Sequence, residues 1–191
     1  MQHGGQRFWN IPNALTLLRL LLIPVYWLLM MPRSNETWAL AVFVTASLTD
    51  LLDGYIARTY HQITDWGKLL DPLADKLMVV SVMLSLVIKG ALPVIILIIL
   101  LLKEVLMIIG GMLMLHYKVV VYSKPIGKVA QFVVVIGLIL SFFRERFSAP
   151  YHLYVLWVGI ALTLIALVYY AANCLWTIRR QRSDKFPHQE V

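Results

Sequence analysis

The sequence predicts an all-α protein with six transmembrane helices, and three observations lead to this fold class. Hydrophobic residues make up 60% of the 191 positions, against about 45–50% in an average soluble domain. Several apolar runs reach the roughly 20 residues that a helix needs to cross a bilayer. Only 14% of the residues are charged, and the polar stretches between the runs are too short to form a soluble domain. We therefore expect one membrane domain over residues 1–191.

Polar or helix-breaking stretches separate the apolar runs and set their expected order. "MPRSNE" follows the first run, and "KGALP" separates the third from the fourth. "YSKPIG" precedes the fifth, and "FRERFSAP" precedes the sixth. The N-terminal "RFWNIP" combines a cation with an aromatic ring, which predicts a short interfacial segment. The C-terminal tail from about 179 is expected to be flexible. The six expected helices cover residues 13–31, 37–58, 68–89, 91–116, 126–143 and 151–177.

The distribution of lysine and arginine predicts the orientation. The 1–2, 3–4 and 5–6 connections carry only Arg33, Lys89, Arg144 and Arg146 of the 17 basic residues. The other basic residues lie in the termini, in the 2–3 and 4–5 connections, or near them. Because cytoplasmic loops are enriched in these cations, both termini are expected in the cytoplasm. The expected location is the cytoplasmic membrane of a bacterium.

Composition also excludes several classes. The net charge of +7 suggests anionic lipid headgroups as partners, since no segment resembles a nucleic-acid-binding module. Cys174 is the sole cysteine, so an intrachain disulfide is excluded and a metal–thiolate site is not indicated.

Five aspartates gather in "DLLDGYIARTYHQITDWGKLLDPLADK", beside sequence apolar enough for a membrane. Asp50 and Asp53 are three residues apart near the cytoplasmic end of the second helix, so they share a face. Asp71 and Asp75 are four residues apart near the start of the third, again on one face. Pro72 is expected in the first turn of that helix, where a proline costs little. Two carboxylate pairs are thus predicted to face each other.

Such a cluster needs compensation, because several carboxylates in close proximity cannot all stay ionised. Hard oxygen donors suit Mg²⁺ or Mn²⁺, and two such ions with open positions suit phosphoryl transfer. Near the carboxylates, Gly54 and Ala57 leave room for a ligand, Gly67 permits a close backbone approach, and Arg58 offers a phosphate-binding fork.

A purely structural alternative is an ion network at the membrane surface. Arg58, Lys68 and Lys76 supply three cations against five carboxylates, so such a network would be short of positive charge. Asp65 and His61 lie between the two pairs and are expected to be solvated loop residues.

The pattern Asp50-x2-Asp53-Gly54-x2-Ala57-Arg58-x8-Gly67-x3-Asp71-x3-Asp75 resembles, without a gap, the signature of the CDP-alcohol phosphatidyltransferases. "NIPNALTLLRLLLIP" and "GKLLDPLADKLMV" resemble the branch that makes phosphatidylglycerophosphate. The resemblance covers nearly the whole chain and is strongest over residues 10–80.

This resemblance implies a reaction in which CDP-diacylglycerol and an alcohol, here glycerol-3-phosphate, give a phosphodiester lipid and CMP. It implies that the chain is a homodimer. Asp75 would also act as the general base for the acceptor hydroxyl. By position in the motif, the metal ligands would be Asp50, Asp53, Asp71 and Asp75, and the CDP-binding residues would be Gly54, Ala57, Arg58 and Gly67.

The acceptor phosphate would need cations outside the motif. Lys103 lies near the middle of the fourth apolar segment, where a charge is expected to face a cavity; its alternative is a buried pair with an acid. Neighbouring Glu104 is about 100° round the helix, so it need not be that acid. Lys124 and Lys128 precede or begin the fifth helix, where they could bind phosphate or simply follow the positive-inside rule.

Two departures from the phosphatidylglycerophosphate branch leave the acceptor open. That branch typically has Arg-Glu where this chain has Lys103-Glu104, with a later arginine where Gly111 stands. It usually has Gly-Lys-x-Lys-Thr where this chain has Gly127-Lys128-Val129-Ala130-Gln131. A eukaryote-type cardiolipin synthase with phosphatidylglycerol as acceptor therefore remains an alternative, as do acceptors of the inositol-phosphate and serine branches.

Two functions of other classes fit the sequence less well. A cation transporter would place its charges near the midplane on broken helices, with a repeat between its halves, and neither pattern is evident. A non-catalytic scaffold could lose a motif position, whereas all eight are present.

Overall fold

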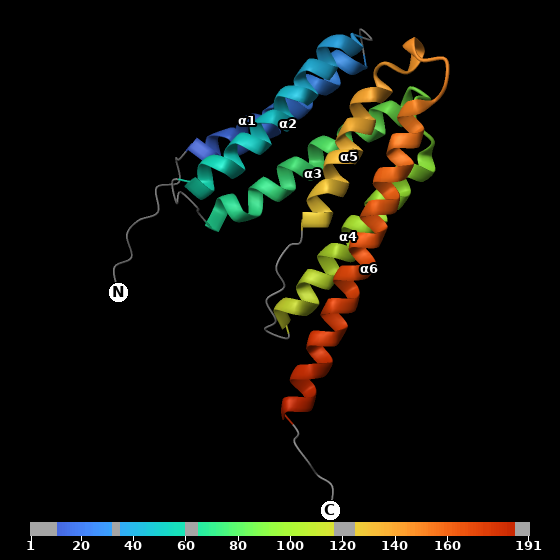
Figure 1. The fold of residues 1–191 in the computed structure, drawn as a ribbon. Helices are drawn as coiled ribbons and strands as arrows, with labels where there is room; N and C mark the ends of the chain where they lie inside the picture. Colours follow the sequence, from blue (N-terminus) through green and yellow to red (C-terminus); the bar gives the residue numbers. More distant parts are fainter. Residues whose placement is uncertain (1–10, 32–34, 60–64, 117–124, 186–191) are drawn as a thin grey trace, which may run out of the picture. The chain divides into compact units, whose positions relative to one another are not determined.

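The computed structural model describes residues 11–31, 35–59, 65–116 and 125–185, and every regular element within these ranges is a helix (Figure 1). The prediction of an all-α fold is therefore confirmed. The helices form two compact units, one built from residues 1–92 and 141–145 and the other from 93–140 and 146–191. The expected interfacial segment lies largely in residues 1–10, outside the described residues.

Unit 1 is a three-helix arrangement in which α1 (Ile11–Met30) packs against both α2 (Glu36–Thr59) and α3 (Asp65–Ile88). The N-terminal ends of α1 and α3 lie at the same end of the unit as the C-terminal end of α2 (Figure 1). Its core contains the fully buried side chains Tyr26, Met30, Phe43, Met83 and Leu86.

A buried hydrogen bond fixes α1 against α3. The hydroxyl oxygens of Tyr26 and Ser85 are 2.5 Å apart, and Ser85 donates its own hydrogen to the carbonyl of Val82 at 2.8 Å. Tyr26 is therefore the donor to Ser85. Both polar groups are satisfied, which is the condition for burying them without a large penalty.

Local sequence explains where the helices of unit 1 begin and end. Asn35 precedes α2, and its carbonyl accepts the amide of Ala39 at 3.1 Å. Gly90 ends α3 with a φ of 70°, in the left-handed region that favours glycine. The amide of Gly90 bonds the carbonyl of Val87 at 2.9 Å and that of Ala91 bonds Leu86 at 2.8 Å, which together form a Schellman cap.

Unit 2 contains α4 (Val94–His116), most of α5 (Pro125–Ser141) and α6 (Tyr151–Lys185). The 3₁₀ turn η1 (Arg144–Arg146) has its first two residues in unit 1 and its last in unit 2. Two glycines bring α5 and α6 together. A Cβ on Gly137 would lie 3.2 Å from the backbone nitrogen of Leu156, and one on Gly159 would lie 3.1 Å from that of Val134. Small residues that permit close backbone approach are typical of helix contacts in membranes.

The six helices match the expected segments to within three residues at nearly every end. The exception is α6, which continues to Lys185 where a flexible tail was expected from about 179. The segment "RRQRSDK" contains no helix breaker, and the next proline is Pro187. Within the described residues, two stretches are long and apolar enough to cross a membrane, Val94–Met114 in α4 and Tyr151–Cys174 in α6. Shorter apolar stretches occupy Ala14–Met30, Glu36–Thr49 and Ile126–Ser141.

Two predictions about α3 were wrong because this helix begins earlier than the apolar pattern indicates. Asp65 is its first residue rather than a loop residue, and an acid there suits the positive end of the helix dipole. Pro72 is consequently inside the helix and not in its first turn. Since proline has no N–H, it cannot donate to the carbonyl of Lys68, four residues earlier.

Candidate active site

All eight motif positions lie on helical backbone at one end of unit 1. Five of them belong to the C-terminal part of α2 and three to the first half of α3. The connection between the two helices is five residues long, residues 60–64. Because it is so short, the end of α2 and the start of α3 lie at the same end of the unit (Figure 1). The fold therefore brings both halves of the motif to one place.

Within each helix the spacing agrees with the sequence-based prediction. Positions 50 and 53 are three residues apart in continuous helix, and positions 71 and 75 are four apart. Such positions are neighbours on a helix face. The side chains of seven motif residues lie outside the part of the chain that the structure describes: Asp50, Asp53, Gly54, Ala57, Arg58, Gly67 and Asp71.

Asp75 is the motif residue whose side chain is described, and it is half-buried. It lies beside two core residues of α3, Ala74 and Met78, which are 0% and 2% exposed. Asp75 and the half-buried Lys76 both have interaction partners in the folded chain. A half-buried carboxylate at the edge of a core can be held in place and still be reached by a substrate.

The chemistry of the donor set fits a hard divalent cation. The four predicted ligands are all carboxylates, the oxygen donors that Mg²⁺ and Mn²⁺ prefer. No group of three potential ligands occurs among the described side chains, which include just one of these four aspartates. Asp50, Asp53, Asp71 and Asp75 therefore remain the residues that would hold such ions.

The lysines predicted to bind the acceptor phosphate differ in their surroundings. Lys103 of α4 forms an ion pair with Glu104, and their side chains are 11% and 21% exposed. A buried pair with an acid was the alternative to phosphate binding that the sequence left open for Lys103, and the adjacent Glu104 is such an acid. Lys128 is exposed in the first turns of α5. Lys124 lies outside the described residues.

Arg19 is a buried charge that the sequence analysis missed. It lies in the middle of α1 and is 1% exposed, with Thr16 on the same face, also 1% exposed. The signal was present, since Arg19 interrupts the apolar run 13–31 just as Lys103 interrupts the fourth. A charge inside an apolar segment points to a functional role by default.

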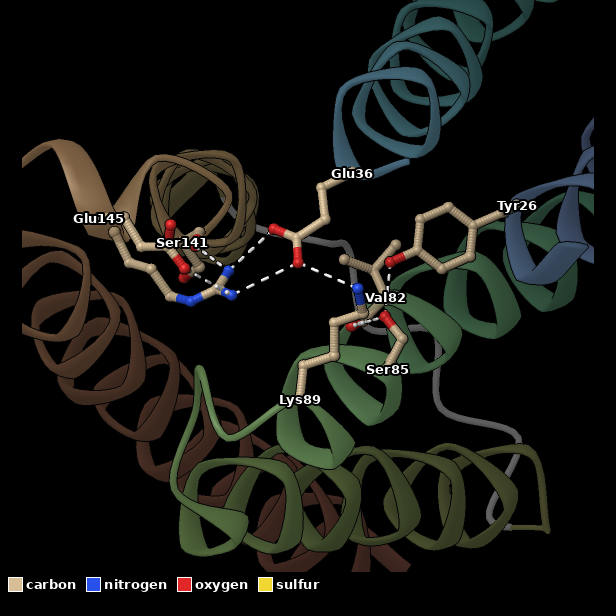
Figure 2. A network of polar contacts seen from close by, with 8 residues as sticks. Tyr26, Glu36, Val82, Ser85, Lys89, Ser141 and Glu145 are labelled. Atoms are coloured by element: carbon tan, nitrogen blue, oxygen red, sulfur yellow. Dashed lines mark hydrogen bonds and ion pairs between the residues drawn. The ribbon is translucent and has the colours of Figure 1, made fainter. Parts of the chain in front are cut away.

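A second charge cluster is formed by Glu36, Lys89 and Arg144 (Figure 2). Glu36 begins α2 and Lys89 follows the last residue of α3, so the cluster lies at the end of these two helices away from the motif. Lys89 Nζ is 3.0 Å from Glu36 Oε1, and Arg144 Nη1 is 3.0 Å from Glu36 Oε2. Arg144 also donates to the carbonyl of Ser141 at 3.4 Å. This cluster joins the start of α2, the end of α3 and the segment after α5.

The cluster lowers the pKa of Glu36. This residue lies just before the predicted span 37–58. Burial by itself would raise the pKa of its carboxyl group. The hydrogen bonds from Arg144 and Lys89 outweigh that effect, so the pKa is below the usual value of a glutamate. Lys89 and Arg144 had been counted only as evidence for orientation, yet both are engaged by one carboxylate.

Comparison with known proteins gives the family. The sequence model of the CDP-alcohol phosphatidyltransferases matches residues 9–165, which include the motif and extend over both units. The chain belongs to this family. The match confirms the resemblance that the motif indicated.

Three similar proteins show which members of the family the chain resembles. Over 80 residues, 41% of each chain, the protein is 50% identical to the CDP-diacylglycerol–glycerol-3-phosphate 3-phosphatidyltransferase of Pseudomonas fluorescens. It is 39% identical over 95 residues to the probable phosphatidylglycerophosphate synthase of Mycobacterium tuberculosis, covering 47% of this chain and 46% of that one. It is 38% identical over 92 residues to the cardiolipin synthase (CMP-forming) of Streptomyces coelicolor, covering 46% and 43%. The aligned parts thus make up less than half the length of these relatives.

Proposed function

We propose that this protein transfers the phosphatidyl group of CDP-diacylglycerol to glycerol-3-phosphate, giving phosphatidylglycerophosphate and CMP. One observation carries the proposal: the complete eight-position motif lies on two adjacent helix ends of unit 1. Membership of the family and the names of similar proteins support it. The product would be an intermediate in phospholipid synthesis.

The residues have distinct roles in this proposal. Asp75 takes the proton of the acceptor hydroxyl, so that the oxygen can attack the phosphorus atom that carries the diacylglycerol. Arg58 binds the pyrophosphate, and Gly54, Ala57 and Gly67 leave space for the cytidine end. Bound to Asp50, Asp53, Asp71 and Asp75, two Mg²⁺ or Mn²⁺ ions would neutralise the pyrophosphate and stabilise the departing CMP. Lys103, Lys124 and Lys128 are candidates for binding the acceptor phosphate.

The location of the site suits substrates of two kinds. The lipid substrate stays in the bilayer while glycerol-3-phosphate and CMP are water-soluble, so the reaction has to occur at the interface. We propose six spans in one membrane domain, with the motif and both termini in the cytoplasm. The match of the family to both units supports the single domain, and a homodimer is the proposed assembly.

Cardiolipin synthesis, with phosphatidylglycerol as the acceptor, is the second candidate. The ion pair between Lys103 and Glu104 favours it, because a lysine already matched by a carboxylate is a weaker site for a doubly charged phosphate. The similarity to a cardiolipin synthase supports the same alternative.

Release of CMP from CDP-diacylglycerol by the purified full chain tests the proposal. The assay contains Mg²⁺ or Mn²⁺ and offers glycerol-3-phosphate and phosphatidylglycerol separately. CMP release with glycerol-3-phosphate alone is the expected result, and release with phosphatidylglycerol alone identifies the second candidate. Asp53→Asn is the matched control and should be inactive with both acceptors. The absence of CMP release from the unmodified protein with either acceptor would refute both functions.

A further inference from the structure

Arg19 lies about one helical turn from the aspartate motif by the register of α1 against α3. The hydrogen bond between Tyr26 and Ser85 pairs these two residues across the helices. Both helices begin at the motif end of the unit (Figure 1), so equal steps back from each residue stay level. Seven residues before Tyr26 is Arg19, and seven before Ser85 is Met78. Asp75 lies three residues further toward the motif end, about 4.5 Å along the helix axis.

The register of α1 against α2 gives the same level independently. The turn between these antiparallel helices is closed by the hydrogen bond from the Asn35 amide to the Leu29 carbonyl, at 3.2 Å. Counting away from the turn places Arg19 near Ala46, which is 0% exposed and leaves room for a large neighbour. Position 50 is one turn beyond Ala46. On both neighbouring helices, the motif therefore begins one turn from Arg19.

The direction of the arginine side chain and its burial complete the geometry. Long side chains on a helix lean toward its N-terminus, which is the motif end of α1. A guanidinium that is 1% exposed needs nearby negative charge or acceptors to offset its desolvation. Arg19, Thr16 and Asp75 all have interaction partners in the folded chain. The carboxylates of the motif are the acids that the register brings nearest.

We propose that Arg19 is a positioning residue for the aspartate motif. It acts from the core of unit 1 on Asp75 and on the other carboxylates of the motif. The expected effect on turnover rests on the proposed function, whereas the expected effects on unfolding and on Mn²⁺ binding do not. The guanidinium offsets part of the repulsion among the carboxylates before metal ions bind, and it fixes the direction of the Asp75 carboxylate. Arg19 touches neither substrate nor metal in this role.

Thermal unfolding of the full chain in detergent, without substrate, separates this role from simple packing. Arg19→Met should lower the unfolding midpoint by several degrees in EDTA and by clearly less at saturating Mn²⁺, because the metal then compensates the same carboxylates. Tyr26→Phe is the matched control, a buried polar group two turns away on the same face. Tyr26→Phe should lower the unfolding midpoint by the same amount in EDTA and at saturating Mn²⁺. An equal loss for Arg19→Met with and without Mn²⁺, or no loss in either, would overturn the proposal.

Binding of Mn²⁺ alone provides a readout that does not depend on turnover. Removing the guanidinium loosens the Asp75 carboxylate but also removes a positive charge that repels Mn²⁺, so the two effects offset each other and Arg19→Met should still bind Mn²⁺. In the CMP assay, turnover by Arg19→Met should fall by about 10- to 100-fold, as for other groups that orient metal ligands, with a small change in the CDP-diacylglycerol KM. Arg19→Lys should recover part of the turnover. A variant that keeps full turnover, or that loses Mn²⁺ binding, would contradict the role.

Two outcomes are kept apart by this design. Should the unmodified protein release no CMP with any acceptor, the proposed function fails while the unfolding and Mn²⁺ measurements still decide the role of Arg19. Should Arg19→Met fail to fold, Arg19→Lys decides it. The positive charge of the lysine should preserve the unfolding midpoint in EDTA. The lysine lacks the two-pronged guanidinium group of arginine, so turnover should fall. Full turnover by Arg19→Lys together with a lowered midpoint in EDTA would refute positioning.

Discussion

The two ends of unit 1 both concentrate charge, but they balance it in opposite ways. At one end, the single half-buried carboxylate of Glu36 contacts two cations, Lys89 and Arg144, each at 3.0 Å. At the other end, five aspartates share a stretch with three cations, and the buried Arg19 is the further cation that we propose acts on them. The first cluster is complete within the protein. The second has carboxylates in excess, which is the condition for binding external cations.

The largest expected effect is at the carboxylate-rich end. Asp75→Asn removes the proposed base and should lower turnover by at least about 10³-fold, toward the upper range for general-base removal. CDP-diacylglycerol binding should persist, since Arg58 and the small residues of α2 are unchanged. CMP release and lipid binding measure the two effects. Asp65→Asn, the same change in the same helix outside the motif, is the control, and normal turnover by Asp75→Asn would remove it as the base.

Arg58→Ala should produce the next largest effect, and it should act on binding. Loss of a charged hydrogen bond to phosphate costs about 1.5–3 kcal/mol, or roughly 10- to 100-fold in the CDP-diacylglycerol KM. The maximal rate should change less. Initial rates over a range of lipid concentrations measure both, with Lys68→Ala as a control cation outside the motif. An unchanged dependence on lipid concentration would count against the assignment.

Glu36→Gln should disrupt the ion pairs with Lys89 and Arg144 and leave the aspartate motif at the other end of unit 1 intact. It leaves Lys89 and Arg144 half-buried without their carboxylate, and it should reduce the free energy of unfolding by about 1–2 kcal/mol. Thermal unfolding in detergent should show the reduced stability, while the KM values for CDP-diacylglycerol and glycerol-3-phosphate stay unchanged. Glu145→Gln is the matched control, because Glu145 is 87% exposed and 3.6 Å from Arg144. A larger effect of Glu145→Gln would show that the half-buried contacts of Glu36 are not the stabilising ones.

The smallest effect is a pH dependence that belongs to Glu36. Its pKa is lowered on folding, so the unfolded chain binds the proton more readily, with a pKa of about 4.3. The stabilisation is complete above that value and is lost as the pH falls through the lower pKa of the folded state. The difference in unfolding midpoint between the unmodified protein and Glu36→Gln should therefore shrink on acidification below about pH 4. A difference that stays constant would reject the assignment.

The sequence was sufficient for the elements that depend on local pattern. Apolar runs and helix breakers gave six helices with nearly correct ends, because each helix needs its own stretch of apolar residues. The motif was also readable, since its eight positions lie within 26 residues. The start of α3 was misplaced because "DWGKLLDP" is polar enough to hide a helix that Pro72 would be expected to interrupt.

Contacts between distant residues could not be read in the same way. Glu36 and Arg144 are 108 positions apart, and no local pattern joins them. The burial of Arg19 could not be predicted, because it depends on how α1 packs against α2 and α3. The ion pair of Lys103 and Glu104 depends on side-chain bending that helical angle does not capture.

The contacts of Glu36 also imply an order of events during synthesis of the chain. Lys89 is made 53 residues after Glu36, and Arg144 is made 108 residues after it. At translation rates of about 5–20 residues per second, Glu36 leaves the ribosome roughly 5–20 s before its second partner. The helices that carry the aspartate motif are therefore complete while the opposite end of unit 1 still lacks Arg144. The finished protein acquires that contact only after α5 has been made.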